Sequence, residues 1–342
     1  MVRVVVVGAT GAVGTEVLRI LEERNFPVDE LVPVASPRSI GRKLEFGGAE
    51  VEVAGLRPEV FDGADIAIFD VSEDLSSEWA PVAAERGAVV IDKSSAFRMD
   101  DEVPLVVPEI NADQVRNRPK GIIATPNCTT TAMVMPLAPL HREWTVNRLV
   151  VATYQAASGS GQPGTDELWE QTQLAAKEPE AVREGRAGDV IKGGGTFVHP
   201  LALNVLPKCG SVREDGYTSE ELKLCHETRK ILGIPDLKAT ATCVRVPVVT
   251  GHGVSAHAEF DSDVSVDRAR EILAASPGVE LADDVDNDVY PTPLDAANQD
   301  PCFVGRIRKD LFDDRALEFF SVGDNLRKGA ALNAVQIAEL LL

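Results

Sequence analysis

Residues 2–14, VRVVVVGATGAVG, decide the fold of the first part of the chain. The run of valines is typical of a strand buried on both faces of a parallel sheet. Gly8, Gly11 and Gly14 then mark a turn, and residues 15–24 are expected to form an amphipathic helix. Glycines let a backbone approach a pyrophosphate, and a helix N-terminus favours negative charge. This corner therefore predicts a dinucleotide site.

The end of the second expected strand, residues 31–35, favours NADP over NAD. A fold selective for NAD usually places a carboxylate here to bind the ribose 2′-hydroxyl, whereas an arginine accommodates a 2′-phosphate. Ser36, Arg38 and Ser39 follow the strand, and no carboxylate does. The alternative is that Arg38 is an ordinary solvated loop arginine.

Short apolar runs continue through the first part of the chain and predict a doubly wound α/β sheet. The remaining strands are expected at residues 65–71, 88–92, 104–107 and 121–124, with a helix at 76–86. Arg98 follows the C-terminal end of one of these strands, the edge where such sheets bind ligands. It is a candidate anion contact, and an ordinary loop arginine is the alternative.

After residue 127 the pattern changes to that of an α+β domain with a mainly antiparallel sheet. Strands are expected at residues 149–156, 239–249, 253–260, 302–308 and 317–322, and helices at 165–176, 219–232 and 327–342. The turn at residues 250–253 suggests a hairpin or meander. Ser219 is the expected cap of the helix at 219–232. Residues 178–195 are expected to form an exposed excursion. We expect a Rossmann-like NADP-binding domain at 1–127, joined by the C-terminal helix 323–342, and a second domain at 128–322.

Composition describes a globular protein with an acidic surface. The chain has 342 residues and a net charge of −20, spread over its length, which disfavours nucleic acid and anionic membranes as partners. No apolar run approaches the roughly 20 residues that span a bilayer, and the first residues do not read as a signal peptide. Five cysteines without regular spacing fit a reducing compartment and no metal site, so we expect a cytoplasmic protein.

The stretch GIIATPNCTTTAMVM, residues 121–135, is the candidate catalytic centre. It reads as a strand, a polar corner and a helix that starts at or beside Cys128. A thiol at a helix N-terminus is favoured as the thiolate, the nucleophilic form. The alternative is that Cys128 is a buried structural cysteine. The polar Asn127 before it and the run of threonines after it argue against such an apolar site.

A thiol nucleophile needs a base, an orienting group and residues that hold the substrate. Among five histidines, His252 is bracketed by glycines at a strand end and is the best candidate base. Gln155, at another strand end, could orient a carbonyl. Arg245 is a charge within a β-branched strand and suits a carboxylate. Glu220 and Lys223 share one helix face, where a surface ion pair is the alternative.

Several motifs together resemble the aspartate-β-semialdehyde dehydrogenase family. They run in order along nearly the whole chain: GATGAVG at residues 8–14, VVPEIN at 106–111, PNCTT at 126–130, TYQAASGSG at 153–161, ATCVRVPV within 240–248, FVGRIRKD at 303–310, and SVGDNLRKGAALNAVQIAE at 321–339. The resemblance implies an enzyme that interconverts aspartyl phosphate and aspartate semialdehyde with NADP and inorganic phosphate. It also implies that the second domain is catalytic and forms a homodimer, with a homotetramer as the alternative.

The resemblance assigns roles residue by residue. Cys128, with Asn127 beside it, would form an acyl-thioester, His252 would be the acid/base residue and Gln155 would position the acyl group. Arg245 would hold the α-carboxylate, Glu220 the amine, and Arg98 and Lys223 the phosphate. The NADP contacts would be Gly8, Thr10, Gly11, Ala12, Val13, Ser36, Arg38, Ser39, Ser158, Gly159 and Asn325.

Two other functions stay open from the sequence. Other phosphorylating dehydrogenases act on glyceraldehyde 3-phosphate or N-acetylglutamyl phosphate, and the pairing of Glu220 with Arg245 argues instead for a substrate with a free amine and carboxylate. A redox sensor that binds NADP and oxidises Cys128 would show no turnover with any aldehyde.

Overall fold

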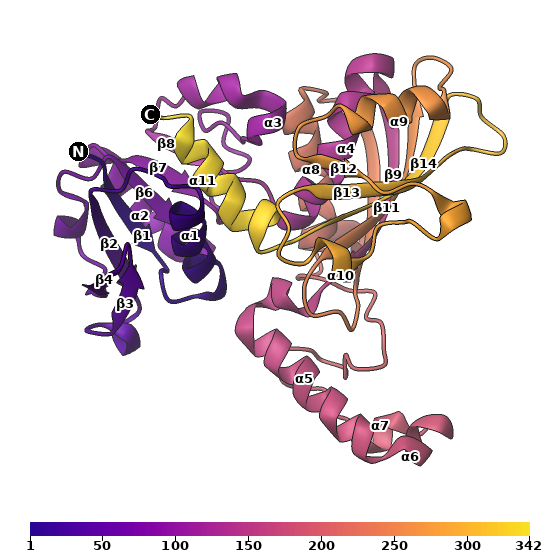
Figure 1. Cartoon of the computed structure of the whole chain (residues 1–342), viewed down its shortest axis with the longest axis horizontal. Coiled ribbons are helices and arrows are strands. Elements are labelled where there is room, and N and C mark those ends of the chain that lie inside the picture. Colours follow the sequence, from indigo (N-terminus) through magenta and orange to yellow (C-terminus); the bar gives the residue numbers. More distant parts are fainter. The chain divides into compact units, whose positions relative to one another are not determined.

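The computed structural model describes residues 1–342 except for the side chain of Glu214, and its contacts divide the chain into two units (Figure 1). The first unit comprises Met1–Asn127, Lys230–Gly233 and Leu326–Leu342, and the second Cys128–Arg229 and Ile234–Asn325. Among the described residues, no helix combines the length and the apolarity that crossing a membrane requires.

The first unit is built on a six-stranded, fully parallel sheet of order β5-β2-β1-β6-β7-β8. Its strands are β1 (Arg3–Val7), β2 (Glu30–Ala35), β5 (Ala54–Gly55), β6 (Ile66–Phe69), β7 (Val89–Asp92) and β8 (Ile122–Ala124). The strand order reverses at β1, so the expected doubly wound arrangement is confirmed. Such a reversal is where open α/β sheets bind ligands, at the carboxyl ends of the strands.

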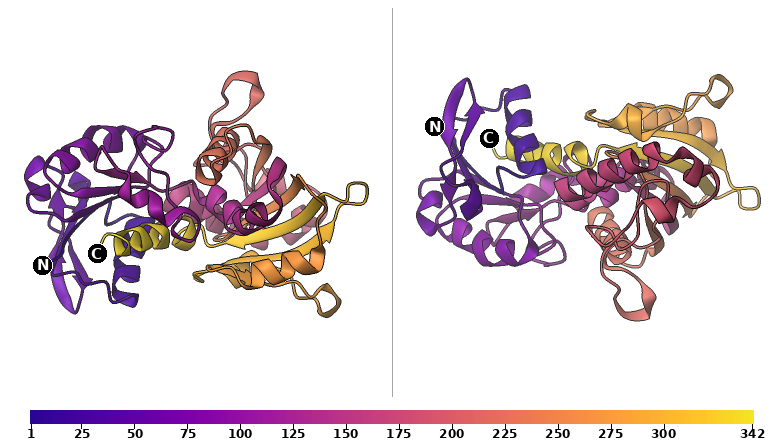
Figure 2. Two further views of the ribbon diagram at one scale, coloured as in Figure 1. Left: turned by 90° about the horizontal axis from the view of Figure 1, so that it is seen from above. Right: turned by 90° about the horizontal axis from the view of Figure 1, so that it is seen from below.

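Helices cover the sheet of the first unit. They are α1 (Ala12–Glu23), α2 (Glu73–Glu85), the short α3 (Pro108–Asn111), and a C-terminal helix made of a π-turn (Arg327–Ala331) and α11 (Leu332–Glu339). Apolar residues of α1 and α11 share one core cluster with β1 and β6. In Figure 2, α11 (yellow) accordingly lies beside the indigo N-terminal elements of this unit. The C-terminal helix thus packs on the first unit, as expected.

Two local predictions in the first unit need correction. Residues 104–107 do not form a strand: only Leu105 bridges to β8, through Ala124, because Pro104 has no N–H and α3 begins at Pro108. A small hairpin of β3 (Lys43–Phe46) and β4 (Ala49–Glu52) was not expected.

The second unit is built on a mixed six-stranded sheet of order β10-β9-β11-β14-β13-β12. Its strands are β9 (Val146–Gln155), β10 (Lys238–Arg245), β11 (His252–Phe260), β12 (Val279–Leu281), β13 (Cys302–Lys309) and β14 (Ala316–Gly323). Three of the five strand pairs are antiparallel, as expected of a mainly antiparallel sheet. Helices α4 (Cys128–Trp144) and α9 (Val266–Ala274) pack on it.

The predicted hairpin around residues 250–253 is wrong. β10 and β11 do not pair with each other: both pair with β9, β10 in parallel and β11 antiparallel. The connection therefore passes over the carboxyl end of β9 instead of closing a tight turn. This crossing brings Arg245, at the end of β10, and His252, at the start of β11, to the end of β9 at Gln155.

The remaining helices are α5 (Gly161–Lys177), α6 (Pro179–Arg183), α7 (Ala187–Val190), α8 (Ser219–Leu232) and α10 (Pro293–Ala296). All belong to the second unit except the end of α8 from Lys230, which belongs to the first. The expected exposed excursion at residues 178–195 is partly wrong. It contains α6 and α7, and its buried Ala181 and Ile191 share a core cluster with Leu168 of α5 and with Phe197. Helix α8 has the predicted bounds, but its cap is Thr218, whose hydroxyl accepts from the N–H of Glu221.

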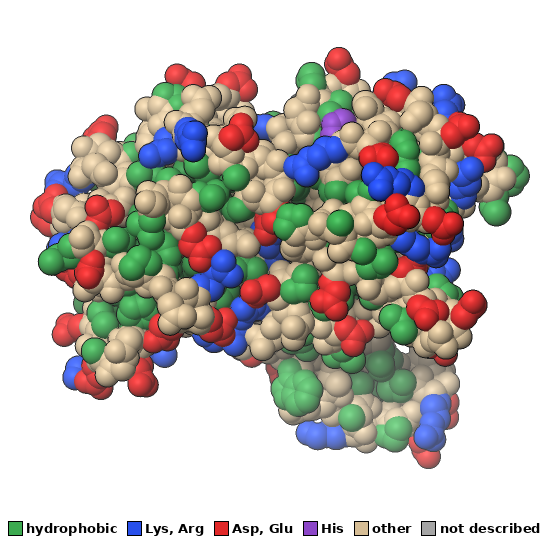
Figure 3. Space-filling view, turned by 45° about the horizontal axis from the view of Figure 1, so that its top comes forward, with side chains coloured by type: hydrophobic (Ala, Val, Ile, Leu, Met, Phe, Trp, Pro, Cys, Tyr) green, Lys and Arg blue, Asp and Glu red, His purple; other side chains and the backbone are tan. Residues whose placement is uncertain are grey.

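Charged side chains of both signs are interspersed over the face shown in Figure 3, and the acidic ones do not gather there in one patch. This distribution agrees with the spread of acidic residues along a sequence of net charge −20.

Candidate active site

The glycine turn of the first unit has no room for side chains. Gly8 has a φ of +94°, and a Cβ there would lie 2.1 Å from the backbone oxygen of Asp70. A Cβ on Gly14 would lie 2.1 Å from the oxygen of Gly8. The turn closes tightly onto the start of α1, where Gly11 is exposed and Ala12 is partly exposed. A helix N-terminus of this kind favours a pyrophosphate.

The loop after β2 lies next to this turn. The hydroxyl of Thr10 donates to that of Ser39 at 3.4 Å, and Arg38 is exposed in the single 3₁₀ turn between Pro37 and Ser39. These contacts bring predicted nucleotide residues from two loops together. These residues offer hydroxyl groups and one positive charge at this loop, and the choice of NADP over NAD stays a prediction.

Cys128 is the first residue of α4, as the sequence predicted. Among the five cysteines, all in the described part of the chain, Cys128 is partly exposed and the other four are buried. Thr129, Thr130 and Thr131 in the first turn are buried, as is Asn127 just before it. A reagent can therefore reach this thiol at the positive end of a helix.

Gln155, Glu220 and Lys223 form a chain of polar contacts in the second unit. The amide of Gln155 donates to Glu220 at 3.2 Å, and the ammonium of Lys223 lies 3.6 Å from the same carboxylate. The amide oxygen of Gln155 accepts from the hydroxyl of Thr153 at 3.1 Å. The ion pair of Glu220 and Lys223, given above as a surface alternative, is thus part of a network that includes Gln155, whose side chain is only 1% exposed.

Arg245 and His252 are joined through the backbone of Ala156. The guanidinium of Arg245 donates to the oxygen of Ala156 at 2.6 Å, and the N–H of Ala156 donates to Nδ1 of His252 at 3.0 Å. A Cβ on Gly159 would lie 2.8 Å from Nη1 of Arg245 and 3.1 Å from Nε2 of His252. Arg245, His252 and the Gly159 backbone therefore meet at one point.

The protonation of His252 follows from its surroundings. Burial, and then the positive charge of Arg245, lower the pKa of His252 well below its usual value, so the ring is neutral. Because Nδ1 accepts a hydrogen bond, the proton of the neutral ring sits on Nε2. Nε2 is buried and bonds to no described residue, so its N–H is an unused hydrogen-bond donor.

Asn325 connects the two loops that flank this point. Its amide donates to the hydroxyl of Ser158 at 2.9 Å, and its oxygen accepts from the N–H of Gly251 at 2.9 Å. Both Ser158 and Asn325 are buried. Their roles in cofactor binding stay predictions, and these contacts show that Asn325 also fixes the loop that leads into His252.

Cys209 and Glu221 are neighbours of this cluster that the sequence did not reveal. Burial raises the pKa of Cys209 to about 11, and Arg245, Glu220, Glu221 and Cys128 also act on it electrostatically. Cys128 and Arg245 are thus both among the groups whose charge acts on Cys209. Glu221 accepts from the N–H groups of Thr218 and Cys243 and ties the start of α8 to β10. The T-x-x-E spacing of a capping box could have revealed Glu221.

Arg98 lies in the first unit, in the loop after β7, and is 7% exposed. Its guanidinium donates to the backbone oxygen of Lys93 at 2.6 Å, and Lys93 pairs with Asp70 at 2.9 Å. Asp70 is the residue against which Gly8 packs. Arg98 is therefore held near the nucleotide turn within the same unit, and is not a solvated loop arginine.

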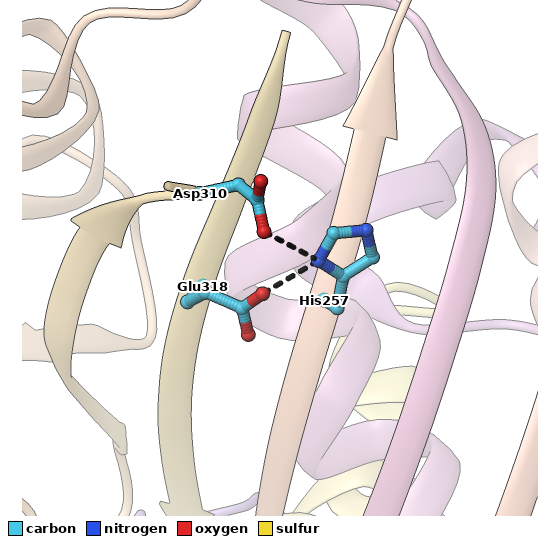
Figure 4. Close-up of side chains that lie close together, drawn as sticks. All are labelled: His257, Asp310 and Glu318. Atoms are coloured by element: carbon cyan, nitrogen blue, oxygen red, sulfur yellow. Dashed lines mark hydrogen bonds and ion pairs between the residues drawn. The ribbon is translucent and has the colours of Figure 1, made fainter. Parts of the chain in front are cut away.

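A separate cluster of titratable groups lies on β11 and its neighbours (Figure 4). Nδ1 of His257 lies 2.5 Å from Glu318 and 3.9 Å from Asp310, and Nε2 lies 3.3 Å from Glu259. Burial alone would lower the pKa of His257, but the hydrogen bonds to Glu318 and Glu259 outweigh it and raise that pKa. A protonated histidine bound by carboxylates accounts for this cluster.

Two family models of semialdehyde dehydrogenase domains match this chain. The model of the semialdehyde dehydrogenase NAD-binding domain matches residues 3–118, and that of the semialdehyde dehydrogenase dimerisation domain matches residues 137–328. These matches define a semialdehyde dehydrogenase with a nucleotide-binding and a dimerisation domain.

Full-length relatives identify the family more narrowly. Aspartate-semialdehyde dehydrogenase of Streptomyces akiyoshiensis is 52% identical, with 99% of this chain and 98% of the relative covered, and that of Corynebacterium glutamicum is 49% identical with both chains fully covered. The crystal structure of aspartate semialdehyde dehydrogenase II of Vibrio cholerae matches with a TM-score of 0.92 at 41% identity, covering 99% and 98% of the two chains. The chain belongs to the aspartate-semialdehyde dehydrogenase family.

Proposed function

We propose that the chain catalyses the reversible, NADP-dependent reduction of L-4-aspartyl phosphate to L-aspartate 4-semialdehyde with release of phosphate. The observation that carries this proposal is the convergence of Arg245, His252 and Gly159 on Ala156. Support also comes from the relatives named as aspartate-semialdehyde dehydrogenases and from a Vibrio cholerae structure described as complexed with ASA, 40% identical with a TM-score of 0.93.

The substrate carries an amine, a carboxylate and a phosphate, and the chain offers a partner for each. Arg245 has five N–H donors, of which one bonds to Ala156, so its guanidinium can bind the α-carboxylate. Glu220 would bind the amine. Arg98 and Lys223 would bind the phosphate, and Gln155 and Asn127 would orient the acyl group beside Cys128.

The first chemical step would be attack by the Cys128 thiolate on the acyl carbon. A carbon–sulfur bond forms and the bond from carbon to the phosphate oxygen breaks, so phosphate leaves and an acyl-thioester remains. The position of Cys128 at the start of α4 favours the thiolate for this attack.

His252 would act as a hydrogen-bond donor through Nε2. Its N–H can bond to the thioester oxygen and stabilise the negative charge that develops there on reduction. When this anionic thiohemiacetal collapses, the carbonyl re-forms, the carbon–sulfur bond breaks, the sulfur of Cys128 leaves as the thiolate, and Nε2 keeps its proton throughout. The same residue then serves the reverse reaction.

The cofactor would be held by the glycine turn, the loop after β2 and the Ser158 loop. Gly8, Thr10, Gly11, Ala12 and Val13 would bind the pyrophosphate, Ser36, Arg38 and Ser39 the adenosine ribose with its 2′-phosphate, and Ser158, Gly159 and Asn325 the nicotinamide end. When bound, NADPH supplies the hydride that reduces the acyl group.

The reaction would belong to the aspartate-family pathway to lysine, threonine, methionine and isoleucine, in the cytoplasm. A homodimer through the second unit would be the working form, with a tetramer as the alternative.

The test is to follow the absorbance of reduced nicotinamide with aspartate semialdehyde, inorganic phosphate and NADP⁺. Absorbance that rises only when all three are present is the expected result. A rise with glyceraldehyde 3-phosphate or N-acetylglutamate semialdehyde instead would refute the substrate assignment. If a folded protein that binds NADP gave no rise in absorbance with any aldehyde, the proposed function as a whole would be refuted.

A further inference from the structure

Lys230 holds one segment of the first unit by its backbone. Its ammonium donates to three carbonyl oxygens, at 2.8 Å to Arg98, 2.7 Å to Asp100 and 2.8 Å to Val103. A lysine ammonium has three N–H donors, and these bonds use all of them. Lys230 and its three partners all belong to the first unit.

The bonds of Lys230 differ from an ordinary surface ion pair. The carboxylate of Asp100 points to another residue, Lys120, at 2.6 Å. Lys230 is partly buried beside a cavity of about 310 Å³ that Asp101 and Val103 also line. Three backbone bonds to a partly buried cation fix the course of residues 98–103 more firmly than an exposed pair could.

The segment that Lys230 fixes begins with Arg98. The Arg98 guanidinium is held to the oxygen of Lys93, and its own carbonyl is held by Lys230. Both ends of Arg98 are thus fixed before any ligand arrives, and such preorganisation matters for binding an anion. Lys230 lies in the last turn of α8, the helix that carries Glu220 and Lys223 near its start.

We propose that Lys230 is a positioning residue: by fixing the backbone of residues 98–103 it sets the Arg98 guanidinium for the phosphate of the substrate. This inference rests on the proposed function, because it takes phosphate as the ligand of Arg98. Lys230 itself does not touch the substrate.

Steady-state kinetics of Lys230→Met test the positioning role. Loss of the three bonds is expected to raise KM for inorganic phosphate roughly tenfold while KM for NADP⁺ changes less than about twofold. Lys230→Arg, which keeps a cation and its donors, is expected to recover part of the loss. Lys120→Met is the matched control, because it removes exposed ion pairs to Asp100 and Glu102 in the same segment and is expected to change neither constant.

A double-mutant cycle with Arg98→Gln shows whether Lys230 acts through Arg98. In that background Lys230→Met is expected to change KM for phosphate less than about twofold, because the guanidinium it positions is gone. Additive effects in the cycle, an equal loss of phosphate and NADP⁺ binding, or an unchanged phosphate KM would each overturn the proposal. If Lys230→Met does not fold, Lys230→Gln serves in the same cycle.

Binding of inorganic phosphate measured by calorimetry separates this proposal from the proposed function. If the wild type binds phosphate but turns over no aldehyde, the proposed function fails. The positioning role is then decided by whether Lys230→Met weakens phosphate binding in the wild type and leaves it unchanged in Arg98→Gln. A wild type that turns over while Lys230→Met binds phosphate normally would refute only the positioning role.

Discussion

The backbone N–H of Ala156 donates a hydrogen bond to Nδ1 of His252 at 3.0 Å. This bond leaves the proton of the neutral ring on Nε2, the nitrogen that no described residue binds. The ring is thereby set to donate a hydrogen bond to the reacting oxygen. It is not set to withdraw a proton from Cys128.

Substitutions of His252 separate these two roles. His252→Gln keeps an N–H donor near the position of Nε2, so it is expected to retain at least about tenfold more kcat than His252→Ala, since one oxyanion donor is worth about 10²–10³ in rate. Burial and Arg245 lower the pKa of His252, so kcat of the wild type is expected to show no histidine ionisation between about pH 6 and 8. Equal kcat for both variants, or an acid limb near the usual histidine pKa, would identify His252 as a base.

Gly159 lies where the substrate carboxylate and the reacting oxygen would meet. A methyl group there would come 2.8 Å from Nη1 of Arg245 and 3.1 Å from His252, so Gly159→Ala must displace the guanidinium. We expect kcat/KM for aspartate semialdehyde to fall roughly 10- to 100-fold with little change in Tm. Gly188→Ala, where a Cβ meets nothing, is the control. A normal kcat/KM in Gly159→Ala would show that the substrate does not bind beside Gly159.

Arg38 is the residue that we expect to recognise the 2′-phosphate of NADP. Removal of its charge in Arg38→Ala is expected to raise KM for NADP⁺ roughly tenfold and to leave KM for NAD⁺ unchanged, because only NADP⁺ has the 2′-phosphate. Both constants come from initial rates at saturating aldehyde and phosphate. Arg57→Ala, which removes an exposed arginine that follows β5, serves as the charge-matched control. If the two KM values rise together, Arg38 does not recognise the 2′-phosphate.

The His257 cluster predicts a pH-dependent contribution to stability. Glu318 and Glu259 raise the pKa of His257 above that of the unfolded chain, so its stabilisation is fully present below about pH 6.5. It is lost as the pH rises through the folded-state pKa. The Tm difference between wild type and His257→Gln is therefore expected to be larger at pH 6 than at pH 9, measured by calorimetry. A difference independent of pH would mean that His257 stays neutral. Asp310 and Arg308, which also lie near the cluster, remain unchanged in both proteins.

The sequence predicted those parts of the fold that local patterns determine. The valine strand, its glycine turn and the bounds of α8 follow from periodicity and capping signals in one stretch of chain. The pairing of β10 and β11 was mispredicted because adjacent strands usually form hairpins, and here β9 lies between them. The membership of residues 230–233 in the first unit likewise depends on long-range contacts that no local pattern reveals.

The candidate site was predictable in its residue types and less so in its connections. Cys128, His252 and Arg245 could be selected because a thiol at a helix start, a glycine-flanked histidine and a strand arginine are unusual. That Ala156 joins Arg245 to His252 could not be read from sequence, because the bonds use backbone atoms. Lys230 was missed for the same reason.

The most direct measurement is to mix the enzyme with aspartate semialdehyde and NADP⁺ without phosphate, and to follow reduced nicotinamide and the mass of the protein together. If Cys128 forms an acyl-thioester, a single equivalent of reduced cofactor is expected per active site, with the acyl mass on the peptide that contains Cys128. Inorganic phosphate is then expected to discharge the adduct and restore turnover, and Cys128→Ala to show neither burst nor adduct. Continuous turnover without phosphate, or a full burst in Cys128→Ala, would contradict the account.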